Sequence, residues 1–127
     1  MADHQECSGG VETAIEIIVG KWKPVILYQL MSNGTKRFSE LKHALPGITQ
    51  KMLTAQLREL ESHDIIQRKV YAQVPPKVEY SITTYGLSLM PIMTAMHEWG
   101  LAHLNRMQHK QDAVDHTTEN EVAIYNR

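Results

Sequence analysis

The chain has 127 residues, 43% of them hydrophobic and 21% charged, which is the size and composition of a single globular domain. No apolar run reaches the roughly 20 residues that cross a bilayer, and the polar start MADHQEC is unlike a signal peptide. We therefore expect a cytoplasmic protein without membrane contact. Its single cysteine, Cys7, excludes an internal disulfide.

The net charge of −1 is unevenly distributed along the chain. Residues 20–77 contain ten basic and four acidic residues, a net +6, whereas the remainder contains three basic and ten acidic residues, a net −7. A basic centre between acidic ends is expected when one surface meets phosphates and the rest keeps the protein in solution. Chance clustering of the charges is the alternative.

The first helix is predicted over residues 11–19, after a polar segment, residues 1–8, that we expect to be flexible. Its apolar stripe consists of Val11, Ala14, Ile15 and Ile18. A second helix follows Gly20, because Pro24 suits a first helical turn, where its missing N–H is not needed. This helix should run to about Met31, and residues 35–38 should form one short strand or an extended link.

Two further helices are predicted in close succession. Ser39 is a plausible N-cap for a short helix that Pro46 and Gly47 end, and Thr49 is an N-cap for a helix over residues 49–60. The second of these helices buries a stripe of Leu53, Leu57 and Leu60. Helices joined by so tight a link have helix-turn-helix geometry, in which the second helix reads DNA and the first supports it.

The exposed face of this second helix carries hydrogen-bond donors and no carboxylates. Gln50, Thr54 and Arg58 are successive i+4 neighbours, and Lys51 lies beside them. Such side chains at the leading end of a helix suit base edges and phosphates in a major groove. An ordinary solvated helix face is the alternative.

A two-residue alternation then predicts a β-hairpin with strands over residues 66–71 and 77–82. Its tip, residues 73–76, contains two prolines and is flanked by Arg68, Lys69 and Lys77. A stiff basic hairpin directly after a reader helix is typical of a DNA-contacting wing, although a hairpin that only closes the core is the alternative. The predicted DNA-binding residues are Lys36, Arg37, Thr49, Gln50, Lys51, Thr54, Arg58, Arg68, Lys69, Gln73 and Lys77.

The last and longest helix is predicted from about Thr84 to His109, with Thr83 as its cap and Pro91 either bending it or starting a second piece. Its apolar stripe is too wide for one small domain to cover, so we expect burial against a second copy; folding back on its own domain is the alternative. The predicted dimer interface consists of Val11, Ile15, Ile18, Leu89, Met93, Met96, Trp99, Leu104 and Met107. The folded domain should then span residues 9–109, followed by an acidic, mobile tail, residues 110–127.

Five motifs occur in order over residues 11–104: GKWK at 20–23, RFSEL at 37–41, LTAQLREL at 53–60, PKVEYSIT at 76–83 and WG at 99–100. They resemble the motifs of HxlR-type regulators, winged helix-turn-helix relatives of the MarR proteins. The resemblance implies a homodimeric transcription factor without catalytic activity, which in several members senses electrophiles or oxidants through a thiol. Two positions differ, since Asp64 stands where the family usually has glycine, and the family's cysteine would fall at Gly9 rather than Cys7.

Other chemistry finds little support in the sequence. His97, His103 and His109 are six apart, unlike the i, i+4 spacing that brings two imidazoles to one metal, and no phosphate-binding loop or nucleophile motif is present. We therefore expect no enzyme, no cofactor and no metal. A winged-helix module for protein contacts and a one-cysteine thiol redox protein remain the alternatives to a regulator.

The sequence as a whole predicts a mainly α fold with a small β-hairpin, a winged helix-turn-helix with a long C-terminal dimerisation helix. The expected partners are double-stranded DNA with an inverted-repeat operator and a second copy of the chain, with repression as the expected role. A small electrophile or oxidant could act only through Cys7, by a bridge between subunits, a mixed disulfide or an adduct, because no second thiol exists.

Overall fold

The computed structural model describes the backbone of residues 2–125 and the side chains of residues 9–115. The chain divides into two units, one up to Met90 and one from Pro91. None of the described helices is long and apolar enough to span a membrane.

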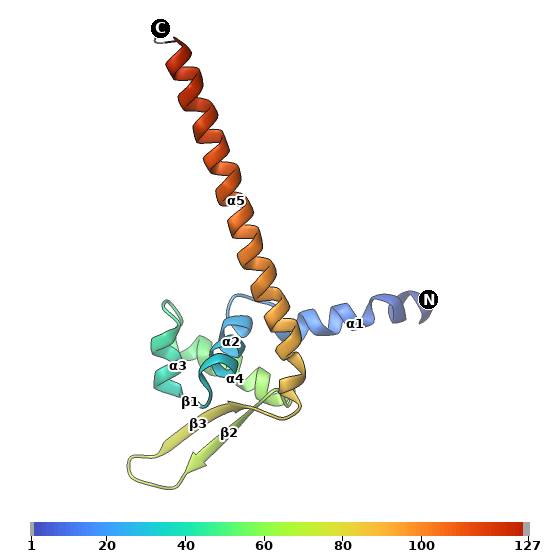
Figure 1. The fold of residues 1–127 in the computed structure, drawn as a ribbon. Coiled ribbons are helices and arrows are strands. Elements are labelled where there is room, and N and C mark those ends of the chain that lie inside the picture. The colour runs from blue at the N-terminus through green and yellow to red at the C-terminus, as the bar shows by residue number, and fades with distance from the viewer. Residues whose placement is uncertain (1, 126–127) are drawn as a thin grey trace. The chain divides into compact units, whose positions relative to one another are not determined.

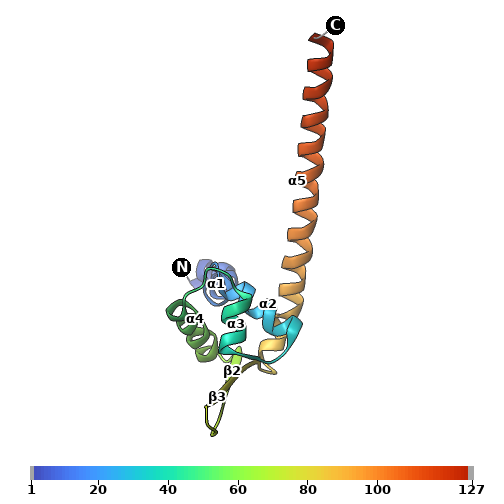
Figure 2. The ribbon, with the colours of Figure 1, turned by 90° about the vertical axis from the view of Figure 1, so that its left-hand side faces the viewer.

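The first unit is a small helical domain with a projecting hairpin (Figures 1 and 2). The mainly α fold with a small sheet is confirmed, and the helix-turn-helix is formed by two successive helices joined through residues 45–49. The elements in chain order are α1 (Ala2–Ile18), α2 (Lys23–Asn33), β1 (Lys36–Arg37), α3 (Phe38–Ala44), α4 (Gln50–Ser62), β2 (Ile66–Tyr71), β3 (Lys77–Ile82) and η1 (Gly86–Leu89).

The core of this unit is built from apolar side chains of α2, α3, α4 and β2. The predicted stripe of α4 is confirmed, because Leu53, Leu57 and Leu60 are all at most 2% exposed. The largest fully buried side chains are Ile26, Leu27, Leu41, Leu53, Leu57, Leu60 and Ile66. Truncating such a side chain to alanine typically lowers the free energy of unfolding by about 2–5 kcal/mol. A rotation of α4 that exposed its three leucines would therefore be costly, and this fixes the orientation of the helix.

The sheet is antiparallel with the strand order β1-β3-β2, so the short strand at residues 36–37 joins the predicted hairpin. Ile66 pairs with Ile82 and Lys69 with Glu79, while Arg37 of β1 also pairs with Glu79. Because side chains alternate across a strand, this register defines two faces. The inner face carries Ile66, Arg68, Val70, Val78, Tyr80 and Ile82, and the outer face carries Arg37, Gln67, Lys69, Tyr71, Lys77, Glu79 and Ser81.

Two backbone positions fix the course of the chain around the hairpin. Asp64 has a left-handed φ of 61°, which a short polar side chain tolerates. Gly86 is buried, and a Cβ there would collide with the backbone oxygen of Ile65. Thr83 fastens this junction, because its hydroxyl donates to the Ile65 carbonyl at 3.1 Å and accepts from the N–H of Gly86 at 2.8 Å.

The start of α3 differs from the prediction. Ser39 lies inside the helix rather than at its N-cap, which is Arg37. The cap works through the acidic residue of the first turn, since the Arg37 N–H donates to Glu40 Oε1 at 2.9 Å. A carboxylate that reaches back in this way replaces the hydroxyl we expected to cap the helix.

Helix α1 begins at Ala2, earlier than the apolar periodicity predicted. No proline interrupts residues 2–18, and Thr13 donates to the Gly9 carbonyl at 2.7 Å, so the two glycines are accommodated within the helix. The side chains of residues 1–8 lie outside the described part of the chain. Flexibility of this segment therefore stays a prediction.

The predicted last helix is divided and longer than expected. Thr83 is not the N-cap of this helix: its hydroxyl accepts the N–H of Gly86, the first residue of the 3₁₀ turn η1, whose N-cap is Tyr85, and α5 (Met90–Tyr125) follows η1 with Pro91 in its first turn. The helix continues beyond His109 because no proline or glycine follows Gly100, and Gln108–Asp112 and Gln111–Asp115 hydrogen bonds support its surface. The prediction that this helix ends near His109 is therefore wrong, since the backbone is helical to Tyr125, while the mobility of residues 110–127 stays a prediction.

Candidate nucleic-acid interface

Helix α4 presents the polar face that the sequence predicted. Thr49 caps the helix by accepting the Met52 N–H at 3.1 Å. With the leucine stripe in the core, Gln50, Lys51 and Arg58 are exposed to solvent. Thr54 is half-buried, and its hydroxyl donates to the Gln50 carbonyl at 2.8 Å. We call Gln50, Lys51, Thr54 and Arg58 the reader face.

The acidic residues of α4 are engaged elsewhere. Glu59 forms an ion pair with Lys23, a lysine only 9% exposed, and this hydrogen bond lowers the pKa of the Glu59 carboxyl. Within the described part of the chain, neither Lys51 nor Arg58 has an ion-pair partner. The reader face therefore offers unneutralised donors to a ligand in solution.

Arg68 does not extend outward from the hairpin as a wing residue would. Its Nε lies 3.3 Å from Glu61 Oε2 on α4, so the arginine bridges the inner face of the sheet to the reader helix. A small cleft of about 230 Å³ between these elements is lined by Thr54, Leu57, Arg58, Glu61, Arg68 and Tyr80. Burial raises the pKa of the Tyr80 phenol, so the hydroxyl stays protonated and can donate a hydrogen bond there.

On the outer face, a cluster of charges surrounds the ring of Tyr71. The ammonium groups of Lys69 and Lys77 lie 4.9 and 4.8 Å from the ring centroid. Lys77 Nζ also lies 2.8 Å from Glu79 Oε1, and the Tyr71 hydroxyl donates to Glu79 Oε2 at 3.2 Å. The hydrogen bond from Lys77 lowers the pKa of Glu79, so this carboxylate remains charged between the lysines.

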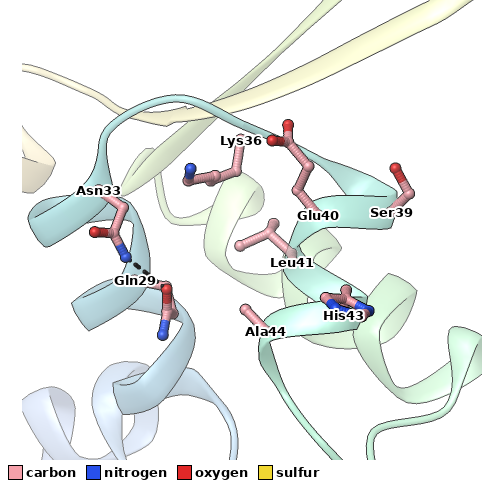
Figure 3. A pocket seen from close by; sticks show the side chains of 8 residues that line it. All are labelled: Gln29, Asn33, Lys36, Ser39, Glu40, Leu41, His43 and Ala44. Carbon is pink, nitrogen blue, oxygen red and sulfur yellow. Dashed lines mark hydrogen bonds between the residues drawn. The ribbon is translucent and has the colours of Figure 1, made fainter.

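Lys36 and Arg37 are separated by the strand alternation. Lys36 is half-buried and lines a pocket of about 570 Å³ together with Gln29 and Asn33 of α2 and five residues of α3 (Figure 3). Arg37 is exposed and belongs to the outer face, opposite Glu79. The predicted DNA-binding residues thus fall into a reader group, an outer-face group and the separate Lys36.

The tip of the hairpin is fully solvent-accessible. Val74 is 100% exposed and Gln73 is also exposed, while the Gln73 N–H donates to the Tyr71 carbonyl at 3.0 Å. An exposed tip beside exposed basic residues has the form of a wing that can reach the backbone next to the reader helix.

Comparison with known proteins agrees with this geometry. A family model described as "HxlR-like helix-turn-helix" matches residues 17–108. Two helix-turn-helix transcriptional regulators of Bacillus subtilis, YtcD and YdeP, are 57% and 53% identical to the chain over 97 residues, which is 76% of this chain and about three quarters of each relative. The solved structure of the redox regulator HypR in its reduced form is 49% identical, with a TM-score of 0.73 over 78% of this chain and 97% of that one.

The chain belongs to the HxlR-like helix-turn-helix family. As an HxlR-type protein it is a DNA-binding transcriptional regulator, and its relatives are named as regulators rather than enzymes. The family assignment made from five sequence motifs is confirmed.

Apolar side chains of this HxlR-type protein remain exposed on α1 and α5. Among the predicted interface residues, those that are exposed on the single chain are Val11, Ile15, Met96, Trp99, Leu104 and Met107. Ile18 and Met93 are buried, with only 6% and 5% of their surface exposed, so they have little surface left for a partner. Leu89 is half-buried. On α5 a groove lined by Pro91, Ile92, Ala95, Met96 and Trp99 is almost entirely apolar.

Cys7 falls within the helical backbone of α1, and its side chain lies outside the described residues. Sequence reasoning missed Glu61, Tyr71 and Glu79 as parts of the interface. The signal for Glu79 was available, because the alternation that predicted the two strands also places residue 79 on the same face as Lys77. For Glu61 no such signal was available, because its partner Arg68 lies beyond a turn whose geometry the sequence does not predict.

Proposed function

We propose that this regulator is a homodimeric repressor that reads an inverted repeat through the reader face of α4. The observation that carries the proposal is the reader face itself, where Lys51 and Arg58 are exposed and without ion-pair partners among the described residues. Arginine and lysine pair best with guanine edges and glutamine with adenine, so these side chains supply the base discrimination. Thr49 and Thr54 lie at the margins of the same contact.

The sheet contributes phosphate contacts in this proposal. Lys69, Arg37 and the tip at Gln73 are exposed next to the hairpin, and they attach to backbone phosphates on either side of the groove that α4 occupies. Such contacts add affinity and fix orientation without reading sequence. Lys36 is the least suited of the predicted contacts, because it is half-buried in a pocket between α2 and α3.

Dimerisation is supported by the exposed apolar side chains of α5 and α1. Met96 is 43%, Trp99 68% and Leu104 67% exposed on the single chain, which is more apolar surface than one helix normally leaves in water. A two-fold dimer places two reader helices about 34 Å apart and so requires half-sites roughly 10 base pairs apart. Repression follows as the simplest outcome, because a bound dimer that occludes a promoter needs no surface for the polymerase.

A thiol input is the last part of the proposal. HypR is named a redox regulator, and the only thiol through which this chain could respond similarly is Cys7. An oxidised or alkylated Cys7 would act by shifting α1 at the subunit interface, which changes the spacing of the reader helices.

The test is a selection of duplexes from a random library by the full-length protein, followed by footprinting on the DNA that flanks its own gene. We expect the selected sequences to share an inverted repeat and the footprint to cover two half-sites one helical turn apart. Recovery of no common sequence, or of a single asymmetric half-site, would contradict the proposal.

A further inference from the structure

Two cations of the sheet, Arg68 and Lys77, are each paired with a carboxylate of the same chain. Arg68 Nε contacts Glu61 Oε2 at 3.3 Å, and Lys77 Nζ contacts Glu79 Oε1 at 2.8 Å. Lys51, Arg58 and Lys69 have no ion-pair partner in the described part of the chain. The basic surface is therefore made of free cations and of cations that are already neutralised.

We infer that Glu61 and Glu79 act as specificity-determining residues, which keep Arg68 and Lys77 away from random DNA and release them to phosphate only when α4 is seated on its operator. This inference rests on the proposed function. It assigns a role to two acidic residues within a surface that otherwise binds a polyanion.

The geometry allows this exchange. The side chains of Arg68 and Glu61 are 49% and 39% exposed, and those of Lys77 and Glu79 are 25% and 22% exposed, so solvent and a phosphate oxygen can reach both pairs. Exposed ion pairs are weak, and a close phosphate can replace the carboxylate. The carboxylate that is left behind then repels the phosphate, which makes the exchange unfavourable unless other contacts hold the DNA in place.

Each of the two ion pairs also has a neighbour that bears on the exchange. Glu79 accepts the Tyr71 hydroxyl at 3.2 Å, and the ring of Tyr71 lies 4.8 Å from the Lys77 ammonium, so the pair is held over the aromatic ring. Glu61 faces the cleft that Arg58 also lines, so the Arg68 pair lies directly beside a residue of the reader face. Binding of Arg58 to a base edge therefore also changes the environment of the ion pair between Arg68 and Glu61.

The experiment measures how the affinity of the full-length protein depends on salt, by fluorescence anisotropy, for two duplexes. One is a duplex of about 30 base pairs that the wild type has selected, and the other is the same duplex with its sequence scrambled. The variants are Glu61→Gln and Glu79→Gln, which keep the side-chain shape and a hydrogen-bond acceptor. Glu12→Gln on α1 is the matched control, because it removes one exposed carboxylate that has no cationic partner among the described residues.

For the scrambled duplex, each site variant should bind about two- to fivefold tighter per subunit, and its slope of log K against log salt should steepen by about 0.9 for each freed cation. For the selected duplex the slope should stay at the wild-type value, because the cations have already moved to phosphate. Glu12→Gln should change affinity by less than about twofold at physiological salt, where the Debye length is about 8 Å. Thermal unfolding of each variant shows that the fold is intact.

The double variant Glu61→Gln with Arg68→Met removes the released cation as well, so the gain on the scrambled duplex should disappear. An unchanged slope on the scrambled duplex, an equal steepening on both duplexes, or a gain that survives Arg68→Met would each overturn the inference. If the wild type binds neither duplex at any salt concentration, the proposed function itself is overturned.

Discussion

The reader face of α4 and the outer face of the sheet are both basic, but they hold their charges differently. On α4 the carboxylates of Glu59 and Glu61 are drawn away to Lys23 and Arg68, which leaves Lys51 and Arg58 free. On the sheet, Glu79 lies among Lys77, Tyr71 and the register partners Lys69 and Arg37. The first surface is suited to reading bases. On the second surface, the carboxylate of Glu79 weakens the attraction of the neighbouring cations for phosphates of random DNA.

The difference follows from the two backbone periods. On a helix, residues 59 and 61 lie about 200° apart and can turn in different directions, Glu59 toward Lys23 and Glu61 toward Arg68. On a strand, residues 77 and 79 necessarily share a face. An acidic residue is thus easily removed from a basic helical face, whereas on a basic strand it stays among its neighbours.

The largest expected effect comes from disturbing the junction on which both surfaces depend. Gly86→Ala places a Cβ against the backbone oxygen of Ile65, and the backbone there cannot yield cheaply. We expect a loss of about 3 kcal/mol in the free energy of unfolding, measured by chemical denaturation. Gly10→Ala, where nothing lies within 4 Å of the added Cβ, is the control and should be neutral or slightly stabilising. Equal stability of both variants would show that the junction is not a fixed point of the fold.

The next effect should come from separating the two copies. Met96→Glu puts a charge among the exposed apolar side chains of α5 and should give monomers in sedimentation velocity. Because two half-sites could then no longer be engaged together, affinity for a selected duplex should fall at least about 100-fold. Thr94→Glu, about 200° away around the helix, should stay dimeric. A wild type that sediments as a monomer at micromolar concentration would refute the dimer.

A sharper comparison of the two surfaces uses one residue from each. Arg58→Ala should cost roughly 1–3 kcal/mol of binding free energy, and the loss should depend on which base stands at one position of the site. Lys69→Ala should weaken all duplexes alike and reduce the salt slope by about 0.9 per subunit. Binding of single-base variants of a selected duplex, measured for both proteins, separates the two. If Arg58→Ala is indifferent to sequence, α4 does not read bases there.

How far the sequence predicted this interface can be judged from individual residues. Thr49, Leu53, Leu57 and both hairpin strands were predictable, because a cap, a 3.6-residue stripe and a two-residue alternation are local patterns. The cap of α3 was missed because the N-cap is Arg37, whose N–H donates to the carboxylate of Glu40 three residues on, whereas Ser39 lies inside the helix. The pairing of Arg68 with Glu61 depends on how α4 meets the sheet, a tertiary relation that no local pattern carries.

The smallest effect is expected at the thiol. Cys7 is the single thiol of the chain, and we expect it to react only modestly with oxidants and electrophiles. Diamide or a quinone should lower the DNA affinity of the wild type and leave Cys7→Ser unchanged. If both proteins lose affinity equally, or if neither does, Cys7 is not a sensor.

The central claim is that phosphate contacts supply affinity while the reader face supplies specificity. It is tested most directly by the affinity of the wild-type protein for a selected duplex over a range of salt concentrations. With about four phosphate contacts per subunit of a dimer, log K should fall with log salt with a slope near −7, from roughly −0.9 per contact. An affinity that does not change with salt, or no affinity for any duplex, would contradict the claim.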